Sequence, residues 1–192
     1  MKIGVLAIQG DFAEHIAMLK RLGVETGEVR LPAQLDGLDG LILPGGESTT
    51  IGKLCVDYGL LEPLREFGQR HAVWGTCAGA ILLSKDARRS QPLLGIMDIT
   101  VERNAFGRQV DSFEAELDIG ALNETTESPA RYHAVFIRAP IIESVSGEAK
   151  VLATLPDGRI VAAQQGRLLA TSFHPELTRD TRFHAYFLSL AK

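Results

Sequence analysis

The sequence contains little of what cross-links or anchors a small protein. Its 192 residues include two cysteines, Cys55 and Cys77, and no CxxC pair, which argues against a disulfide scaffold or a cysteine-based zinc site. No basic segment is followed by a long apolar run, so we expect neither a signal peptide nor a membrane span. The expected compartment is a reducing cytoplasm.

The sequence also lacks a strong excess of charge of one sign and any internal repeat. Lysine and arginine number 20 against 24 acidic residues, and the net charge of −4 gives no reason to expect nucleic acid or an anionic membrane as a partner. Hydrophobic residues make up 45% and charged residues 23%, which is usual for a soluble globular protein. Residues 1–192 contain no repeat or low-complexity linker, so they are expected to form a single domain.

Apolar strands and amphipathic helices alternate through the first half of the sequence. Residues 2–9 (KIGVLAIQ) and 40–43 (GLIL) are nearly continuous apolar runs, as in strands buried on both faces, and a helical pattern follows each of them. This alternation predicts an α/β fold with a largely parallel sheet.

The second half changes character and contains mainly strand patterns. We expect strands at residues 94–102, 109–119, 134–138, 150–155, 159–164 and 168–173. The polar segment 119–132 is expected to be a surface loop, and a last helix is expected from about 178 to 190. The second half therefore predicts an antiparallel extension of the parallel sheet, closed by a terminal helix.

Residues 75–79 (GTCAG) place Cys77 in a tight turn between an apolar run and an Ala/Leu-rich helical run. Strand, turn and helix in this order are typical of a nucleophile elbow, where Gly75 and Gly79 permit the sharp turn. The N-terminus of the following helix favours the thiolate form of a cysteine. A buried structural thiol is the alternative. Cys55 shares a helical face with apolar residues and is interpreted as a small core side chain.

Residues 44–48 (PGGES) follow a buried strand, where ligands of parallel α/β sheets usually bind. Two glycines allow the backbone of this loop to point an N–H into a pocket, where it could stabilise an oxyanion, and the N–H of Ala78 is a second donor. The alternative is an ordinary glycine turn before a helix capped by Ser48 or Thr49. A phosphate-binding P-loop is disfavoured because its GK[ST] ending is missing.

Residues 172–176 (SFHPE) place a histidine two positions before a carboxylate. Pro175 favours an extended His174, so we expect His174 and Glu176 to project to the same side. A carboxylate can orient an imidazole and stabilise its protonated form, as the base of a nucleophile requires. The alternative is a surface pair. His15 and His184 lie in amphipathic helical patterns and are interpreted as structural.

Together and in this order, the three segments resemble the class I (triad) glutamine amidotransferases along the whole chain. The resemblance implies a three-layer, flavodoxin-like α/β fold with a mostly parallel central sheet and an antiparallel extension. It also implies that Cys77 is the nucleophile, His174 the acid/base and Glu176 the orienting carboxylate. Gly46 and Ala78 would form the oxyanion hole.

Further segments look like the glutaminase subunits of the pyridoxal 5′-phosphate synthase that uses ribose 5-phosphate. These segments are residues 5–11 (VLAIQGD), 43–50 (LPGGESTT), 101–113 (VERNAFGRQVDSF) and 136–140 (FIRAP). The resemblance implies hydrolysis of L-glutamine through a γ-glutamyl thioester and transfer of the ammonia to a (β/α)8-barrel synthase subunit in a large ring-like heteromeric assembly. It implies no cofactor and no metal.

The resemblance also implies a set of substrate-binding residues, namely Gly46, Glu47, Ser48, Arg103, Ile137 and Arg138. Free glutamine carries a carboxylate and an ammonium, which a guanidinium and an acidic acceptor bind well. Which of the two arginines binds the carboxylate is open. Gln9, Gly10 and the helix after Asp11 are possible contacts of the partner subunit.

Two other function classes compete with this interpretation. One is a different enzyme on the same scaffold, such as the glutaminase of imidazole glycerol phosphate synthase or a cysteine hydrolase. Residues 102–113 (ERNAFGRQVDSF) disfavour the first of these, and the distant HPE motif disfavours the second. The other class is a non-catalytic binding subunit, which the presence of Cys77, His174 and Glu176 disfavours.

Overall fold

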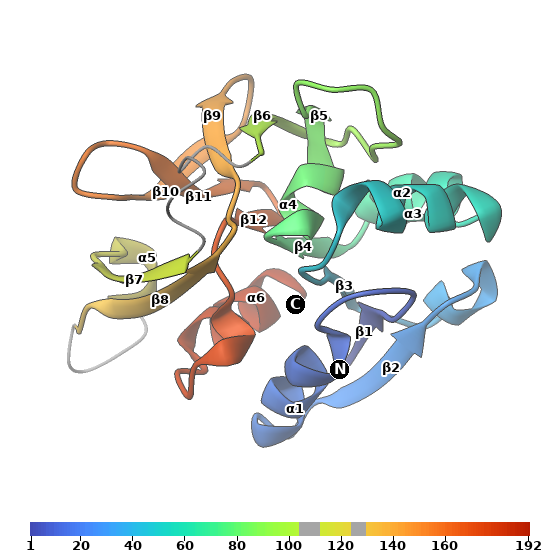
Figure 1. Cartoon of the computed structure of the whole chain (residues 1–192). Helices are drawn as coiled ribbons and strands as arrows, with labels where there is room; N and C mark the ends of the chain where they lie inside the picture. Colours follow the sequence, from blue (N-terminus) through green and yellow to red (C-terminus); the bar gives the residue numbers. More distant parts are fainter. Residues whose placement is uncertain (104–111, 124–129) are drawn as a thin grey trace.

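The computed structural model describes residues 1–103, 112–123 and 130–192. Its centre is a ten-stranded sheet in the order β2-β1-β3-β4-β12-β11-β9-β6-β5, with β10 paired to β11 (Figure 1). The strands of this sheet are β1 (Lys2–Leu6), β2 (Glu25–Val29), β3 (Gly40–Leu43), β4 (Ala72–Thr76), β5 (Ser84–Asp86), β6 (Met97–Glu102), β9 (Ile141–Val145), β10 (Lys150–Thr154), β11 (Ile160–Gln165) and β12 (Leu168–Thr171).

The sheet has a parallel part and an antiparallel part. Strands β2, β1, β3, β4 and β12 pair in parallel, whereas β11 pairs antiparallel with β12, β10 and β9, and β9 with β6. The short β5 at the edge runs parallel to β6. The predicted parallel core with an antiparallel extension is therefore confirmed.

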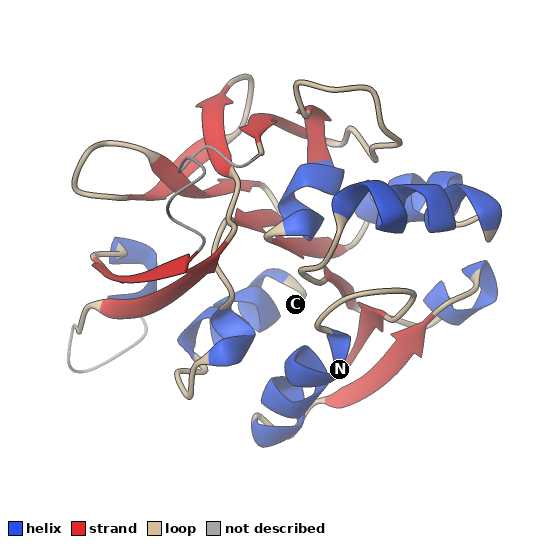
Figure 2. Ribbon diagram, in the orientation of Figure 1, coloured by secondary structure: helices blue, strands red, loops and turns tan. Residues whose placement is uncertain are grey.

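Helices cover both faces of the sheet and complete the three layers (Figure 2). One face carries α2 (Ser48–Asp57), α3 (Leu61–Gly68) and α4 (Ala78–Leu83), and the other carries α1 (Phe12–Arg21) and α6 (Arg182–Leu190). The alternation of side chains along each strand divides the core: Leu41 and Leu43 pack on the first face, and Ile42 packs on the second. Single-turn 3-10 helices η1 (Pro32–Leu35) and η2 (Pro175–Leu177) and the short α5 (Gly120–Asn123) complete the elements.

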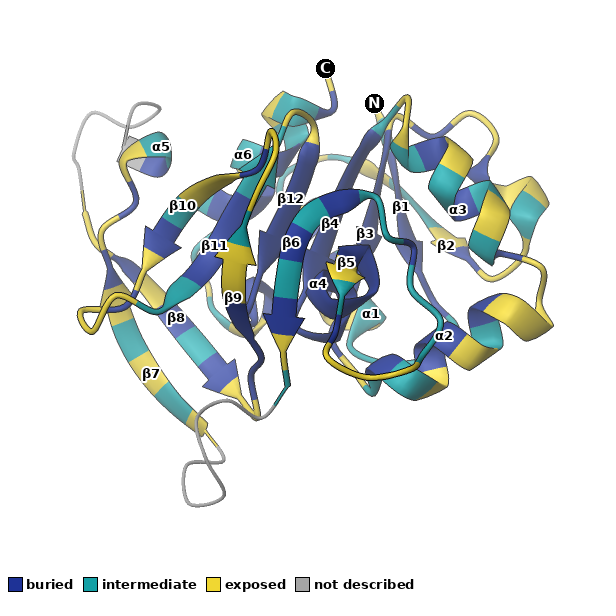
Figure 3. Ribbon diagram, turned by 90° about the horizontal axis from the view of Figure 1, so that it is seen from above, coloured by how far each residue is buried: buried dark blue, intermediate teal, exposed yellow. Residues whose placement is uncertain are grey.

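A separate hairpin of β7 (Ser112–Leu117) and β8 (Tyr132–Ile137) packs against the second face. The rings of Phe113 and Phe136 stack with their centroids 4.4 Å apart, and Tyr132 contacts Phe183 of α6 edge-to-face at 4.8 Å. In Figure 3 the strands at the centre are buried, whereas much of β7 is exposed. The hairpin matters for the site because the end of β8 reaches the cavity at the carboxyl ends of the parallel strands.

Several boundaries differ from the sequence-based expectations. The predicted loop 119–132 contains α5, and its residues 124–129 lie outside the described residues, as do residues 104–111 of the 101–113 segment. Strands β5 and β9 were not expected: β5 has three residues, and β9 places two isoleucines before Glu143 and Ser144 without a period-two pattern. The last helix begins at Arg182, after η2.

In the part of the chain that the structure describes, the longest helices have ten residues, and none is long and apolar enough to cross a membrane.

Candidate functional site

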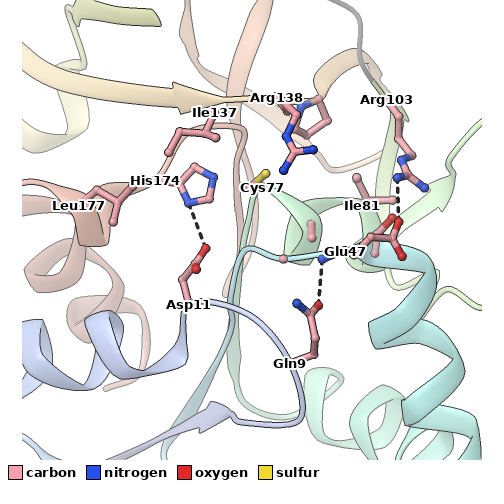
Figure 4. A pocket seen from close by; sticks show the side chains of 14 residues that line it. Gln9, Asp11, Glu47, Cys77, Ile81, Arg103, Ile137, Arg138, His174 and Leu177 are labelled. Carbon is pink, nitrogen blue, oxygen red and sulfur yellow. Dashed lines mark hydrogen bonds and ion pairs between the residues drawn. The ribbon is translucent and has the colours of Figure 1, made fainter. Parts of the chain in front are cut away.

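A cavity of about 420 Å³ lies beyond the carboxyl ends of the parallel strands (Figure 4). It is lined by the loops that follow β1, β3, β4 and β12 and by the end of β8, which is the position expected for a ligand site in a parallel α/β sheet. Nine of the ten predicted site residues line this cavity: Gly46, Glu47, Ser48, Cys77, Ala78, Arg103, Ile137, Arg138 and His174. The tenth, Glu176, is buried and contacts His174.

Cys77 occupies the tight turn between β4 and α4, as the GTCAG pattern predicts. Its backbone angles are φ 47° and ψ −103°, a conformation that non-glycine residues rarely adopt outside functional sites. The turn is fixed by a 2.8 Å hydrogen bond from the Cys77 N–H to the carbonyl of Thr171 in β12. A Cβ at Gly79 would lie 1.9 Å from the carbonyl oxygen of Leu43, so only glycine fits there. The turn therefore holds the Cys77 thiol at the carboxyl end of β4, where it lines the cavity.

His174 contacts both Glu176 and the thiol. Its Nδ1 lies 2.7 Å from Oε1 of Glu176, and both side chains are almost fully buried. Burial lowers the pKa of His174, but its hydrogen bonds with Cys77 and Glu176 outweigh this effect and raise the pKa to about 10. Burial raises the pKa of Glu176, and the hydrogen bond from His174 opposes that rise. An imidazolium between a thiol and a carboxylate stabilises the thiolate.

The expected reason for the His174–Glu176 contact was wrong, although the two side chains do meet. The alternation of an extended strand does not apply, because Glu176 lies in the 3-10 helix η2 and His174 is its N-cap with φ −107° and ψ 86°. Pro175 is the first residue of that helix, where its fixed φ and missing N–H are compatible with a helical turn. A helical turn, rather than a strand, brings the carboxylate to the imidazole.

The glycine-rich loop after β3 is tied to the loop after β1. The carbonyl of Gly45 accepts a 3.1 Å hydrogen bond from the Asp11 N–H, and the Glu47 N–H donates to Oε1 of Gln9 at 2.9 Å. A Cβ at Gly45 would lie 2.5 Å from Cε1 of His174, so the missing side chain leaves room for the imidazole. Gly46 has φ 150° and lines the cavity.

Ala78 is the first residue of α4, so its N–H has no acceptor within the helix. It lines the cavity beside Cys77. The two predicted oxyanion donors, Gly46 and Ala78, thus line the same cavity.

Glu47 and Arg103 form an ion pair at one end of the cavity. Nη2 of Arg103 lies 2.8 Å from Oε1 of Glu47, and Nη1 of Arg103 is buried without a hydrogen-bond partner in the described part of the chain. The Thr49 hydroxyl, followed by Thr50 and Arg103, lowers the pKa of Glu47 to about 2 despite some desolvation. The pair offers a carboxylate acceptor and a spare guanidinium donor to a ligand.

The other predicted substrate-binding residues surround this pair. Ser48 is buried, and its hydroxyl donates to Oε1 of Gln91 at 3.4 Å. Ile137 is the last residue of β8, and Arg138 follows it with a positive φ of 42°. Arg138 and Arg103 both line the cavity, and Figure 4 shows their side chains there. The hairpin therefore supplies a second guanidinium to the site.

One cluster in the described residues has the composition of a metal site. Asp11, His174 and Glu176 offer ligand atoms within 4.8 Å of one another. The 2.7 Å contact between Nδ1 of His174 and Glu176 already uses the ring nitrogen that faces both carboxylates, because Asp11 approaches the same Nδ1 at 3.7 Å. Hydrogen bonding and charge pairing account for this cluster without an ion.

Sequence reasoning did not place five lining residues in the cavity: Gln9, Asp11, Ile81, Pro140 and Leu177. For Gln9 and Asp11 a signal exists, because they directly follow the first buried strand, as residues 44–48 follow the third. Ile81 lies one helical turn after Cys77 and Leu177 lies at the end of η2, so their positions depend on packing alone.

Comparison with known proteins independently supports the resemblance to glutamine amidotransferases. The family model for the SNO glutamine amidotransferase family matches residues 5–191. The chain is 58% identical to the "Pyridoxal 5′-phosphate synthase subunit PdxT" of Herpetosiphon aurantiacus over 99% of this chain and 100% of that protein. It is 56% identical to the protein of the same name from Deinococcus radiodurans, over 100% of this chain and 97% of that protein.

Solved structures agree with the sequence relatives. A crystal structure described as a glutamine amidotransferase superimposes with a TM-score of 0.91 at 51% identity, covering 98% of both chains. The PurLQS structure from Thermotoga maritima matches with a TM-score of 0.75 at 16% identity, which shows a shared fold only. The match over nearly the whole length, in sequence and in structure, shows that this chain belongs to the SNO glutamine amidotransferase family.

Proposed function

We propose that this chain is the glutaminase subunit of a pyridoxal 5′-phosphate synthase, and that it acts in the cytoplasm as a single catalytic domain. It hydrolyses L-glutamine to L-glutamate and ammonia. The observation that carries the proposal is the arrangement of Cys77, His174 and Glu176 at one cavity, with the imidazole between thiol and carboxylate. The full-length similarity to two proteins named as synthase subunits supports the same conclusion.

In the first half of the proposed reaction, the Cys77 thiolate attacks the side-chain amide carbon of glutamine. The tetrahedral oxyanion accepts hydrogen bonds from the backbone N–H groups of Gly46 and Ala78. His174, protonated at the start, donates its proton to the leaving nitrogen, so that the C–N bond breaks and ammonia departs. Glu176 orients the imidazole and stabilises its positive charge. The product is a γ-glutamyl thioester on Cys77.

In the second half, water attacks the thioester carbonyl. His174, now neutral, accepts a proton from this water, and the same two N–H groups stabilise the second oxyanion. The C–S bond then breaks, glutamate leaves, and the thiolate and imidazolium are restored. No metal or cofactor takes part in the proposed reaction.

The ion pair of Glu47 and Arg103 is proposed to hold the amino-acid end of glutamine. Glu47 remains ionised because its pKa is about 2, so it can accept the substrate ammonium. The unpartnered Nη1 of Arg103 is available for the carboxylate, and Arg138, which also lines the cavity, supplies further positive charge. Ser48 and Ile137 complete the proposed binding surface.

Neutralising Arg103 is expected to weaken glutamine binding more than chemistry. Arg103→Gln should raise KM for glutamine about 10- to 100-fold with little change in kcat, because one hydrogen bond between charged groups is lost. Arg138→Gln is the matched comparison and should raise KM less. The assignment of the carboxylate to Arg103 is wrong if Arg138→Gln has the larger effect on KM.

The ammonia is proposed to pass to a (β/α)8-barrel synthase subunit in a large ring-like heteromeric assembly. That subunit forms pyridoxal 5′-phosphate from ribose 5-phosphate and glyceraldehyde 3-phosphate. The loop at Gln9–Asp11 is a possible contact, because it lies at the cavity and is hydrogen-bonded to the glycine loop.

Glutamate release from glutamine, measured with and without the synthase subunit, tests the proposal. We expect the rate to rise sharply when the synthase subunit is added and ammonia to be incorporated into pyridoxal 5′-phosphate. Full activity without the synthase subunit, unchanged when that subunit is added, would support the glutaminase activity and contradict the proposed partner. No activity under either condition would favour a non-catalytic binding subunit.

A further inference from the structure

Two buried histidines lie directly behind the proposed triad. His15 of α1 and His184 of α6 are both 0% exposed, and Nδ1 of His15 lies 3.0 Å from Nε2 of His184. On its other side, Nε2 of His15 lies 3.3 Å from Oε2 of Glu176 and 3.1 Å from the hydroxyl of Thr76, the residue before Cys77. The sequence-based interpretation of both histidines as structural did not anticipate these contacts with Glu176 and Thr76.

The two carboxylate oxygens of Glu176 have different surroundings. Oε1 contacts His174, whereas Oε2 is buried and accepts no hydrogen bond in the described part of the chain. His15 Nε2, at 3.3 Å, is the charge-pairing contact of Oε2. A buried carboxylate oxygen is costly to leave without a donor, so the orientation of the His15 ring affects the whole carboxylate.

The contact with Glu176 favours one tautomer of His15. A neutral imidazole has one donor and one acceptor nitrogen, and an ionised carboxylate only accepts. With the hydrogen on Nε2, His15 can donate toward the Thr76 hydroxyl and Glu176, and its Nδ1 accepts from Nε2–H of His184. This assignment leaves Nδ1 of His184 as an acceptor, and that atom is buried without a partner among the described residues.

Both rings are neutral and rigidly packed. Burial, followed by the charges of His184 and His174, lowers the pKa of His15 well below its usual range, and burial lowers that of His184 to about 3. Trp74 contacts both rings edge-to-face, at centroid distances of 5.7 Å from His15 and 4.9 Å from His184. A neutral donor can hold Glu176 without placing a second positive charge beside the His174 imidazolium.

We propose that His15 is a positioning residue that orients the Glu176 carboxylate through its Nε2–H, and that His184 selects the required tautomer. A chain of close polar contacts then runs from His184 through His15 and Glu176 to His174 and Cys77. The inference rests on the proposed glutaminase function, since it assigns His15 a role in that site. His15 does not line the cavity and is not expected to touch glutamine.

Two substitutions at His15 separate hydrogen bonding from packing. His15→Met keeps most of the volume but removes the donor, whereas His15→Gln can present an amide N–H near the position of Nε2. With the synthase subunit present, we expect His15→Met to lower kcat about 10- to 100-fold at unchanged KM, as for the loss of one charged hydrogen bond. His15→Gln should recover most of this loss. His133→Met, at an exposed histidine of β8, is the matched control.

The pH dependence of thiol alkylation gives a readout that needs no glutamine. Loss of the donor to Glu176 destabilises its ionised form, hence the His174 imidazolium and the Cys77 thiolate. The half-point of Cys77 alkylation by iodoacetamide should therefore move to higher pH in His15→Met, by about one unit, and move little in His15→Gln. The titratable groups around His15 are His184 on α6, Glu176 on η2, and His174, with Asp11 close to the last two.

The outcomes distinguish this inference from the proposed function. Equal losses of kcat in His15→Met and His15→Gln, with an unmoved alkylation profile, would overturn the positioning role and leave His15 as a packing residue. If His15→Met does not fold, His184→Met tests the same tautomer argument and should move the profile in the same direction by a smaller amount; an unmoved profile there overturns it. A moved profile in a chain that releases no glutamate would support the positioning role while the glutaminase fails.

Discussion

Cys77→Ala is expected to abolish glutamate release from glutamine, lowering kcat by about 10⁴-fold or more, because no other group in the site can form the thioester. The thiol of Cys77 lines the cavity, and the backbone N–H of Cys77 donates a hydrogen bond to the carbonyl of Thr171, which fixes the turn. The measurement is steady-state glutamate release in the presence of the synthase subunit, with folding of the variant checked by circular dichroism.

Cys55→Ala is the matched control, since it removes the chain's other thiol. Cys55 is 1% exposed in α2, and burial raises its pKa to about 12, so it is almost entirely protonated at neutral pH. We expect Cys55→Ala to retain activity, and iodoacetamide to label Cys77 but not Cys55 in the wild-type chain. Retained activity in Cys77→Ala, or its loss in Cys55→Ala with the fold intact, would contradict the proposed nucleophile.

Gly79→Ala is expected to destabilise the fold strongly, although it adds a single methyl group. Its Cβ would lie 1.9 Å from the carbonyl oxygen of Leu43, a rigid backbone atom at the centre of the sheet, so α4 or β3 must move. Such overpacking costs about 3 kcal/mol or more, which for a chain of this size lowers Tm by roughly 6–12 °C. Thermal unfolding followed by circular dichroism measures this change.

Gly120→Ala serves as the control for the same chemical change. Among residues 1–103, 112–123 and 130–192, no atom beyond its chain neighbours and its own helix backbone lies within 4 Å of a Cβ built at Gly120, so its substitution should leave Tm nearly unchanged. Similar Tm values for Gly79→Ala and wild type would show that the elbow helix can move away from β3, contrary to the close packing of Gly79 on Leu43. The activity of the Gly79→Ala chain should fall as well, because the same glycine sets the direction of Cys77.

Local sequence patterns predicted much of the fold and most of the residues that line the cavity, because these features depend on residues that are adjacent in sequence. The apolar run before Cys77, the glycines at positions 75 and 79 and the helical run after them specify an elbow without reference to the rest of the chain. The glycine-rich loop after β3 could be predicted from the sequence in the same way. The short strands β5 and β9 were not, because they have little periodicity and form by pairing with β6 and β11.

The contacts of His15 and His184 behind the proposed triad could not be predicted from the sequence, for a different reason. Helical spacing indicates that His15 and His184 face inward, but it does not say which side chain each will meet. The contacts of His184 with His15 and of His15 with Glu176 depend on α1 and α6 covering the same face of the sheet. The extended conformation predicted for His174, and the strand-like alternation drawn from it, failed because Pro175 fits the first turn of a 3-10 helix equally well.

The pairing of β4 with β12 has a consequence for the newly made chain. Cys77 is held by Thr171, and its proposed base lies at position 174, so the site joins segments almost 100 residues apart in sequence. Segments fold in the order in which ribosomes release them only where their contacts are local, and this contact is not. During synthesis the thiol therefore lacks its imidazole until β12 has been added to the sheet. Because β12 also lies between β4 and β11, the strand that brings the imidazole to the thiol is the one that joins the two parts of the sheet.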